Sequence, residues 1–206
     1  MARPRVAPRQ QRSRETYERI LDVAAAIFAE LGYAGTTTNK VAEAAGISIG
    51  TLYHYVPDKD ALLYALAERH LNHGMVDLMD TFGRLRQEQP DLEESLRSVI
   101  KVIVRMHVNE FNLHHLLYDA APRSDELSVR LHEADIAISR EVAFHLERLG
   151  VAARQRSLIS DLLVFGIEAQ VHRATIDATL HGDPPADPEI LTDVMTELWT
   201  KALAGS

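Results

Sequence analysis

The chain has 206 residues, enough for one medium domain or two small ones, and 46% of them are hydrophobic, enough to bury a core. It contains no cysteine, which excludes disulfides, thiolate metal sites and cysteine nucleophiles. No apolar run reaches the roughly 18 residues of a membrane span, and the arginine-containing N-terminus lacks the apolar segment of a secretory signal. We therefore expect neither a membrane span nor a secretory signal.

The net charge of −8 is distributed unevenly along the chain. Residues 1–57 carry 7 basic and 5 acidic side chains, a net charge of +2, so the remainder carries −10. Basic side chains gather at the start, where residues 1–14 include five arginines and no acid. This asymmetry predicts a basic N-terminal part suited to nucleic acid and an acidic remainder with another role.

Residues 1–12 contain prolines and arginines without periodicity, which predicts a disordered basic arm. Such an arm enters a DNA minor groove in some proteins. The simpler alternative is a solvated tail that adds only non-specific attraction to phosphates. Residues 13–31 then place apolar side chains at helical spacing, which predicts a supporting helix that ends at Gly32.

Residues 37–57 are predicted to form two short helices joined by a tight turn. Thr37 or Thr38 supplies a hydroxyl that caps the first helix, and Ser48 caps the second. Gly46 lies where a helix ends in a left-handed residue. This pattern predicts a helix-turn-helix, whose second helix is shaped to lie in the DNA major groove. An ordinary hairpin within a helical bundle is the alternative.

The second helix of this pair packs only a small apolar set inward. Leu52 and Val56 lie one turn apart and face the first helix. The outward side chains are short, polar or aromatic, and they are Ile49, Gly50, Thr51, Tyr53, His54 and Tyr55. Such groups suit hydroxyl and imidazole contacts to phosphates and apolar contact with a thymine methyl.

A set of short residue groups along this stretch strengthens this interpretation. The groups are Thr37-Thr38, Val41-Ala42, Ala45-Gly46-Ile47-Ser48, Gly50-Thr51-Leu52-Tyr53, and Lys59 with Ala61-Leu62-Leu63. In residue type and spacing it resembles the signature of the TetR family of bacterial transcriptional regulators, over about residues 14–65. The resemblance implies an N-terminal three-helix DNA-binding domain, a variable helical effector-binding domain and a homodimer. The chain departs from it at Val56, a core position where many members carry an aromatic residue.

The resemblance also implies which residues touch DNA. The matching family positions are Thr38, Asn39, Tyr53, Tyr55 and Lys59. Among these we expect the two tyrosines and Lys59 to position phosphates; a plain exposed lysine beside Asp58 and Asp60 is the alternative for Lys59. We expect base edges to be read by Asn39, Ile49, Gly50, Thr51 and His54. Asn39 has the geometry to bond adenine in bidentate fashion.

The remainder is predicted to be helical throughout. Expected helices cover residues 59–73, 75–88, 91–108, a short stretch to 121, 125–149, 153–180 and 189–203, with a break at Gly74 and a Pro-rich loop at 182–188. Strand alternation, internal repeats and phosphate-binding glycine loops are not found. The predicted division is an arm at 1–12, a helix-turn-helix domain at 13–57 and a helical effector-binding and dimerisation domain at 58–206.

The last two predicted helices carry apolar faces wide enough to be buried on two sides. Leu158, Leu162 and Phe165 mark the first, and Val194 and Leu198 mark the second. Two such helices from each of two chains would close a four-helix interface, as in the TetR family. A twofold dimer also reads both half-sites of an inverted repeat on one DNA face. Burial within the monomer is the alternative.

Large adaptable side chains in the middle helices predict a chamber for a small-molecule effector. The candidates are Met79, Phe82, His107, Phe111, Tyr118, Phe144 and Phe165. Each of them, taken alone, is equally well explained as a core or exposed side chain. We therefore predict that a pocket exists and leave its exact lining open.

The 10 histidines raise the question of metal binding or catalysis. His70 and His73 share a helix face, and a second cluster comprises His107, Glu110, His114 and His115, near Asp119. Without HExxH spacing or cysteine, surface or pocket histidines are the preferred interpretation, and no metal or other cofactor is expected. A Ser–His–acid hydrolase would need a nucleophile elbow and a strand to carry it, so we do not expect an enzyme.

The sequence thus predicts an all-α, cytoplasmic, homodimeric DNA-binding regulator. We expect a repressor that an unknown small molecule releases from an inverted-repeat operator. The alternatives are a helical small-molecule-binding protein without specific DNA binding and a metal-dependent enzyme on a helical scaffold. The intact stretch from Thr37 to Lys59 argues against the first, and a metal assay addresses the second.

Overall fold

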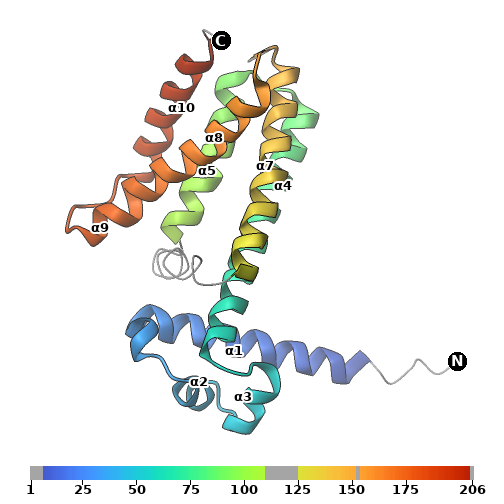
Figure 1. Cartoon of the computed structure of the whole chain (residues 1–206), viewed down its shortest axis with the longest axis vertical. Coiled ribbons are helices and arrows are strands. Elements are labelled where there is room, and N and C mark those ends of the chain that lie inside the picture. Colours follow the sequence, from blue (N-terminus) through green and yellow to red (C-terminus); the bar gives the residue numbers. More distant parts are fainter. Residues whose placement is uncertain (1–6, 110–124, 152–153, 205–206) are drawn as a thin grey trace, which may run out of the picture.

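The computed structural model describes residues 7–109, 125–151 and 154–204. Within these ranges the chain is helical and forms no strand, as the sequence predicted. A compact N-terminal group of helices and a taller bundle are joined by the long helix α4, Lys59–Glu88 (Figure 1). At about 1.5 Å per residue, the 30 residues of α4 extend over roughly 45 Å, so this helix belongs to both parts.

The first helix, α1, spans Ala7–Gly35 and begins earlier than the sequence predicted. Residues 7–12 are helix, not part of a disordered arm, and the rest of that predicted arm lies outside the described residues. The reason is local, because residues 9–12 are arginines and glutamines, which favour helix, and Pro8 lies in the first turn, where its missing N–H costs nothing. The chain bends at Gly32, at φ 66°, where the sequence predicted the end of the helix.

The helix-turn-helix forms as predicted from α2, Thr38–Ala44, and α3, Ile49–Tyr55. The Thr37 side chain accepts a hydrogen bond from the Lys40 amide, and the Ser48 side chain accepts one from the Thr51 amide. Gly46 has φ 66°, in the left-handed region, and the three amides that follow α2 bond back to its carbonyls. Short-range chemistry therefore sets the angle between α2 and α3.

The hydrophobic core of the N-terminal group extends beyond its own helices. Val41, Leu52 and Val56 are buried in it, as the sequence predicted. The same core includes Leu66 of α4 and Leu127, from the first turn of α7, Asp125–Arg148. The N-terminal group and the bundle are thus packed together through α4 and the start of α7.

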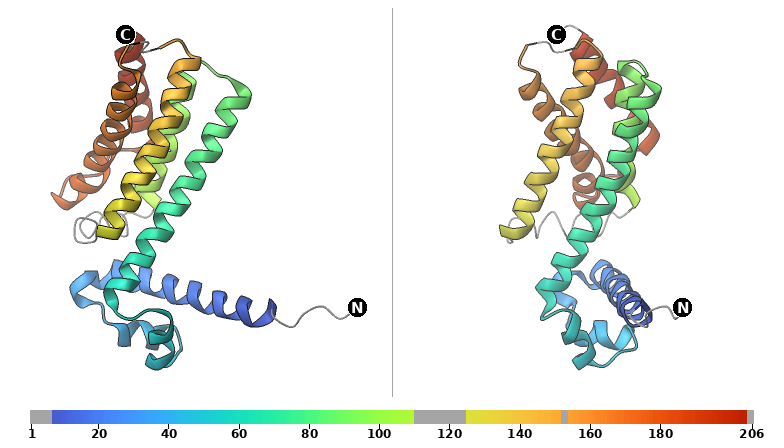
Figure 2. Two further views of the ribbon diagram at one scale, coloured as in Figure 1. Left: turned by 45° about the vertical axis from the view of Figure 1, so that its right-hand side comes forward. Right: turned by 90° about the vertical axis from the view of Figure 1, so that its right-hand side faces the viewer.

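The bundle consists of α4, α5 (Leu92–Asn109), α7, α8 (Arg156–His172) and α10 (Pro188–Ala204), with a π-helical turn η2 (Arg173–Asp177) and a short α9 (Ala178–Leu180) after α8. Helices α4, α5 and α7 run alongside one another, and α8 and α10 cover the side away from α4 (Figure 2). The helix predicted to end near residue 121 lies outside the described residues. In the part of the chain that the structure describes, no helix is both long and apolar enough to cross a membrane.

The predicted break at Gly74 is wrong, because α4 continues through it. A Cβ at this position would collide with the end of the Met106 side chain, which comes from α5. Gly74 therefore leaves room for that side chain against α4, a role that helical periodicity alone does not reveal. A glycine inside a helix costs only about 1 kcal/mol, which packing readily offsets.

Candidate DNA interface and effector cavity

Helix α3 presents the predicted reading surface to solvent. Ile49, Gly50, Thr51, Tyr53 and His54 are exposed, and so is Asn39 on α2. Leu52, on the opposite face of α3, is fully buried. The structure therefore brings six of the predicted DNA-contacting residues to one accessible surface and holds it from behind through an apolar core.

Hydroxyl groups connect α2 and α3 across the turn. Thr38 Oγ1 lies 3.2 Å from Tyr53 Oη, so two predicted DNA-contacting residues share a hydrogen bond. Thr51 Oγ1 lies 2.8 Å from Ser48 Oγ, which also caps the helix. The Thr51 hydroxyl thus has an intramolecular partner that a base edge would have to compete with or share.

Tyr55 faces the supporting helix more than solvent. Its hydroxyl lies 3.3 Å from Ser13 Oγ, and its ring centroid lies 6.1 Å from that of Tyr17. These contacts fix α3 on α1 and leave Tyr55 half-buried. Its contact with a phosphate stays a prediction.

Lys59 is also half-buried and is not the plain exposed lysine that the sequence left open. Its Nζ donates to the Tyr33 carbonyl oxygen at 2.8 Å and lies 3.9 Å from the centroid of the Tyr33 ring. The Tyr33 hydroxyl in turn donates to the Asp60 carboxylate. Because an ammonium has three donors, the bond to Tyr33 still leaves Lys59 able to donate to a phosphate.

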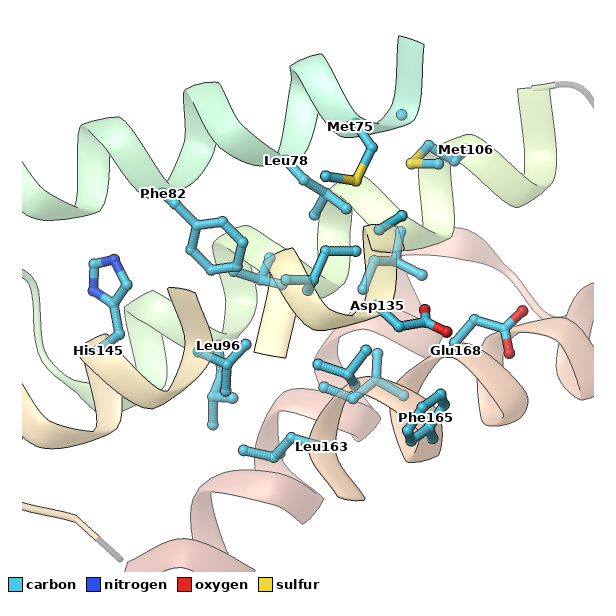
Figure 3. A pocket seen from close by; sticks show the side chains of 18 of the residues that line it. Met75, Leu78, Phe82, Leu96, Met106, Asp135, His145, Leu163, Phe165 and Glu168 are labelled. Atoms are coloured by element: carbon cyan, nitrogen blue, oxygen red, sulfur yellow. The ribbon is translucent and has the colours of Figure 1, made fainter. Parts of the chain in front are cut away.

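A cavity of about 360 Å³ lies among α4, α5, α7 and α8. Its lining is mainly aliphatic and includes Met75, Leu78, Leu96, Met106 and Leu163 (Figure 3). Three of the predicted effector-contacting residues, Phe82, His107 and Phe165, line it. The predicted chamber therefore exists in the middle of the bundle.

The remaining predicted lining residues fall elsewhere. Met79 packs against the apolar cluster around Phe82 and does not line the cavity. Phe144 is 40% exposed and lies under the guanidinium of Arg86, so its place on α7 turns it away from the cavity. Phe111 and Tyr118 lie outside the described residues. The sequence showed which side chains are large but not which side of each helix faces inward.

Titratable groups that the sequence analysis missed lie at the two ends of the cavity (Figure 3). At one end, burial raises the pKa of Asp135, and the negative charge of Glu168 raises it further. At the other end, beside Phe82, burial lowers the pKa of His145, and the positive charges of Arg148 and Arg86 add to this effect. The cavity therefore combines an apolar middle with an acidic end.

His107 also forms a group with two residues of α8. Ligand atoms of His107, Glu168 and His172 all lie within 4.8 Å of one another. The predicted histidine cluster around His107 had other members, and those lie outside the described residues. A sequence signal for the observed group exists, because Glu168 and His172 are four residues apart, a spacing that places two side chains on one face of a helix.

Helices α8 and α10 expose apolar side chains to solvent. The exposed set comprises Leu158, Leu162, Phe165, Ile190, Val194 and Leu198. The two helices are joined by a hydrogen bond of 3.1 Å from Trp199 Nε1 to Gln170 Oε1. Burial within the monomer, the alternative left open by the sequence, therefore does not account for this face.

An exposed reading helix on a buried three-helix core, joined by one long helix to a bundle with an apolar cavity, defines a DNA-binding regulator with a sensing domain. Residues 20–66 match the family model described as bacterial regulatory proteins, tetR family. This match lies in the N-terminal group of helices and confirms the predicted resemblance to the TetR family.

Similar proteins carry regulator names. The chain is 38% identical over 68 residues to the transcriptional repressor KstR2 of Rhodococcus jostii. These 68 residues cover 33% of this chain and 30% of that protein. It is 27% identical over 168 residues to the uncharacterized regulator YvkB of Bacillus subtilis, covering 70% and 89% of the two chains.

Solved structures share the fold over most of the chain. FadR of Bacillus subtilis, in complex with stearoyl-CoA, aligns with a TM-score of 0.69 at 20% identity and covers 88% of this chain and 96% of its own. PfmR of Thermus thermophilus aligns with a TM-score of 0.67 at 19% identity, covering 87% and 96%. At these identities the likeness establishes the fold.

Proposed function

We propose that this regulator is a cytoplasmic repressor that binds an inverted-repeat operator as a homodimer and leaves it when a small molecule fills the cavity. The observation that carries this proposal is the continuity of α4. Its start lies in the N-terminal core through Leu62 and Leu66, and its middle lines the cavity through Met75, Leu78 and Phe82. A ligand in the cavity therefore acts on the same helix that supports the DNA-reading group.

The dimer interface in this proposal is the exposed apolar face of α8 and α10. Exposed large apolar side chains gathered on neighbouring helices are typical of association surfaces. A second copy of the chain is the partner that fits, because a twofold axis through this face would present two α3 helices to one side of a DNA duplex.

The proposed effector has an elongated apolar body. The cavity is lined mainly by aliphatic side chains, with polar groups at its ends, which is the usual composition of a site for such a molecule. The likeness to FadR of Bacillus subtilis, whose structure holds stearoyl-CoA, supports an aliphatic acyl chain as the first class to test. A ligand that binds more tightly to the dimer conformation whose two α3 helices are wrongly spaced for the operator lowers the affinity for the operator. The loss of affinity can be no larger than the ratio of the ligand's affinities for that conformation and for the DNA-binding one.

The test uses the purified protein on a fluorescent duplex recovered by selection from random DNA. Stearoyl-CoA and stearate are titrated separately, and fluorescence anisotropy reports the bound fraction. We expect release of the duplex by at least one of them. The matched variant Met75→Trp places a larger side chain in the cavity and should bind DNA normally but need more ligand for release. Release at the same ligand concentration from both proteins would contradict the proposed site.

A further inference from the structure

We propose that His107, Glu168 and His172 bind a divalent transition metal ion, with Zn²⁺ as the best fit, at the α8 side of the effector cavity. Their ligand atoms lie within 4.8 Å of one another, and His107 Nε2 lies 3.8 Å from Glu168 Oε1. The residues come from α5 and α8, two helices that pack together in the bundle. Nothing in the proposed repressor function requires this metal, so the two proposals stand separately.

The orientation of His107 favours metal binding. Its Nδ1 lies 2.9 Å from the Ile103 carbonyl oxygen, which can only accept, so Nδ1 carries the hydrogen in this bond. The hydrogen bond fixes the ring and leaves Nε2 as the atom on the Glu168 side. Metal-bound histidines commonly donate their other ring nitrogen to a backbone carbonyl in this way. The ring is only 2% exposed, so the surrounding core also limits its motion.

Glu168 and His172 supply the other two ligands from one face of α8. They are four residues apart, and His172 is the last residue before the π-helical turn η2. Such turns are rare and occur frequently at functional sites. The His172 ring is 6% exposed, and its centroid lies 6.0 Å from that of His107.

Two imidazoles and a carboxylate form a ligand set that suits Zn²⁺ and not Mg²⁺ or Ca²⁺, which prefer oxygen ligands. Tetrahedral zinc with bonds near 2.0–2.1 Å places its ligand atoms about 3.3 Å apart. His107 Nε2 and Glu168 Oε1 are 3.8 Å apart, so this pair needs to approach by only about 0.5 Å, and the Glu168 side chain, 44% exposed, is not held in place by the core.

Three protein ligands leave one coordination position open, as in other zinc sites that bind an exogenous group. His107 and Glu168 both line the cavity, so the open position faces it. A water or a donor group of the effector would occupy this position. The ion would also offset the negative charges of Glu168 and Asp135, which lie at this end of the cavity (Figure 3).

The test is metal binding by the untagged full-length protein after treatment with a chelator. Co²⁺ is added as a spectroscopic probe and then displaced by Zn²⁺, while visible absorption reports the coordination. We expect one Co²⁺ per chain with the intense bands of a tetrahedral site. Glu168→Gln and His172→Gln should each weaken binding by more than the roughly 10–100-fold that loss of an outer-shell partner causes.

The matched control is His145→Gln, which removes another buried cavity histidine that is not in the cluster. This variant should keep wild-type Co²⁺ affinity. Circular dichroism confirms that each variant is folded, and Glu168→Gln is the informative one because this side chain is half-exposed. Absence of stoichiometric Co²⁺ binding by the folded wild-type protein, or equal binding by Glu168→Gln, would overturn the proposal. Neither result depends on DNA binding, so both leave the proposed repressor function untouched.

Discussion

At the scale of single residues, His145 makes stability depend on pH. It is 5% exposed, and burial together with Arg148 and Arg86 lowers its pKa in the folded protein, while Glu141 opposes them. In the unfolded chain its pKa is about 6.5. Above that pH His145 is neutral in both the folded and the unfolded chain, so protonation of this residue does not lower the free energy of unfolding. Below it the unfolded chain takes up the proton first, and stability falls until the lowered folded pKa is reached.

We therefore expect the melting temperature to fall more steeply between pH 7.5 and 5 in the wild type than in His145→Gln, which cannot take up this proton. Thermal unfolding followed by circular dichroism at several pH values measures both slopes. Comparing the slopes of melting temperature against pH removes the change in melting temperature that the substitution causes at every pH. Parallel curves would show that His145 titrates alike in both states.

Lys59 gives a second prediction at this scale. Lys59→Met keeps an unbranched stem to pack on Tyr33 but removes the charge. If Lys59 contacts a phosphate, affinity for all duplexes should fall similarly, and the slope of log affinity against log salt should decrease by about 1. Lys40→Met is the matched control: Lys40 lies on α2, and its Nζ donates to the Gly35 carbonyl oxygen. An unchanged salt slope in Lys59→Met would limit Lys59 to its contacts with Tyr33.

At the scale of helices, the sequence predicted those features that depend on short stretches of chain. The caps at Thr37 and Ser48 and the left-handed Gly46 were readable because side-chain and backbone chemistry within a few residues decides them. Gly74 was misread because a neighbouring helix, not its own, explains it.

The cavity shows the same division between local and long-range information. Size and helical period pointed to Phe82, His107 and Phe165, which line the cavity, but not to Asp135, His145 and Glu168, which line it as well. Their importance depends on which helix faces are opposed in space, and one sequence does not contain that information. The residues exposed on α2 and α3 were easier to predict, because these helices are close in the chain and the turn between them fixes their relation.

The face of α8 and α10 gives a prediction about assembly. Removal of α10 is a poor test, because Met195 and Leu203 belong to the buried core of the same chain. Leu162→Glu combined with Leu198→Glu alters only side chains that are more than half exposed. If this face joins two copies, the double variant should sediment as a folded monomer. The control pair Val76→Glu and Val129→Glu changes equally exposed residues on α4 and α7 and should leave the dimer intact.

At the scale of the whole molecule, the two parts are coupled by more than α4. Leu127 of α7 is buried in the N-terminal core. Arg69 of α4 pairs with Asp22 of α1 at 2.7 Å, and Arg130 of α7 lies 3.5 Å from Glu68. Helices that line the cavity therefore reach the DNA-reading group by two routes. A displacement of α4 and α7 by a ligand would tilt that group as a unit, which changes the spacing of two α3 helices in a dimer.

The proposed function requires that the chain bind a specific DNA sequence as a twofold dimer. Selection of random duplex DNA by the purified protein at moderate salt, followed by sequencing of the retained molecules, tests it most directly. We expect an inverted repeat whose half-sites are separated by one helical turn, ~34–36 Å, or a multiple of it. Recovery of no preferred sequence, with binding that disappears as salt rises, would leave only electrostatic attraction to phosphates and would contradict the claim.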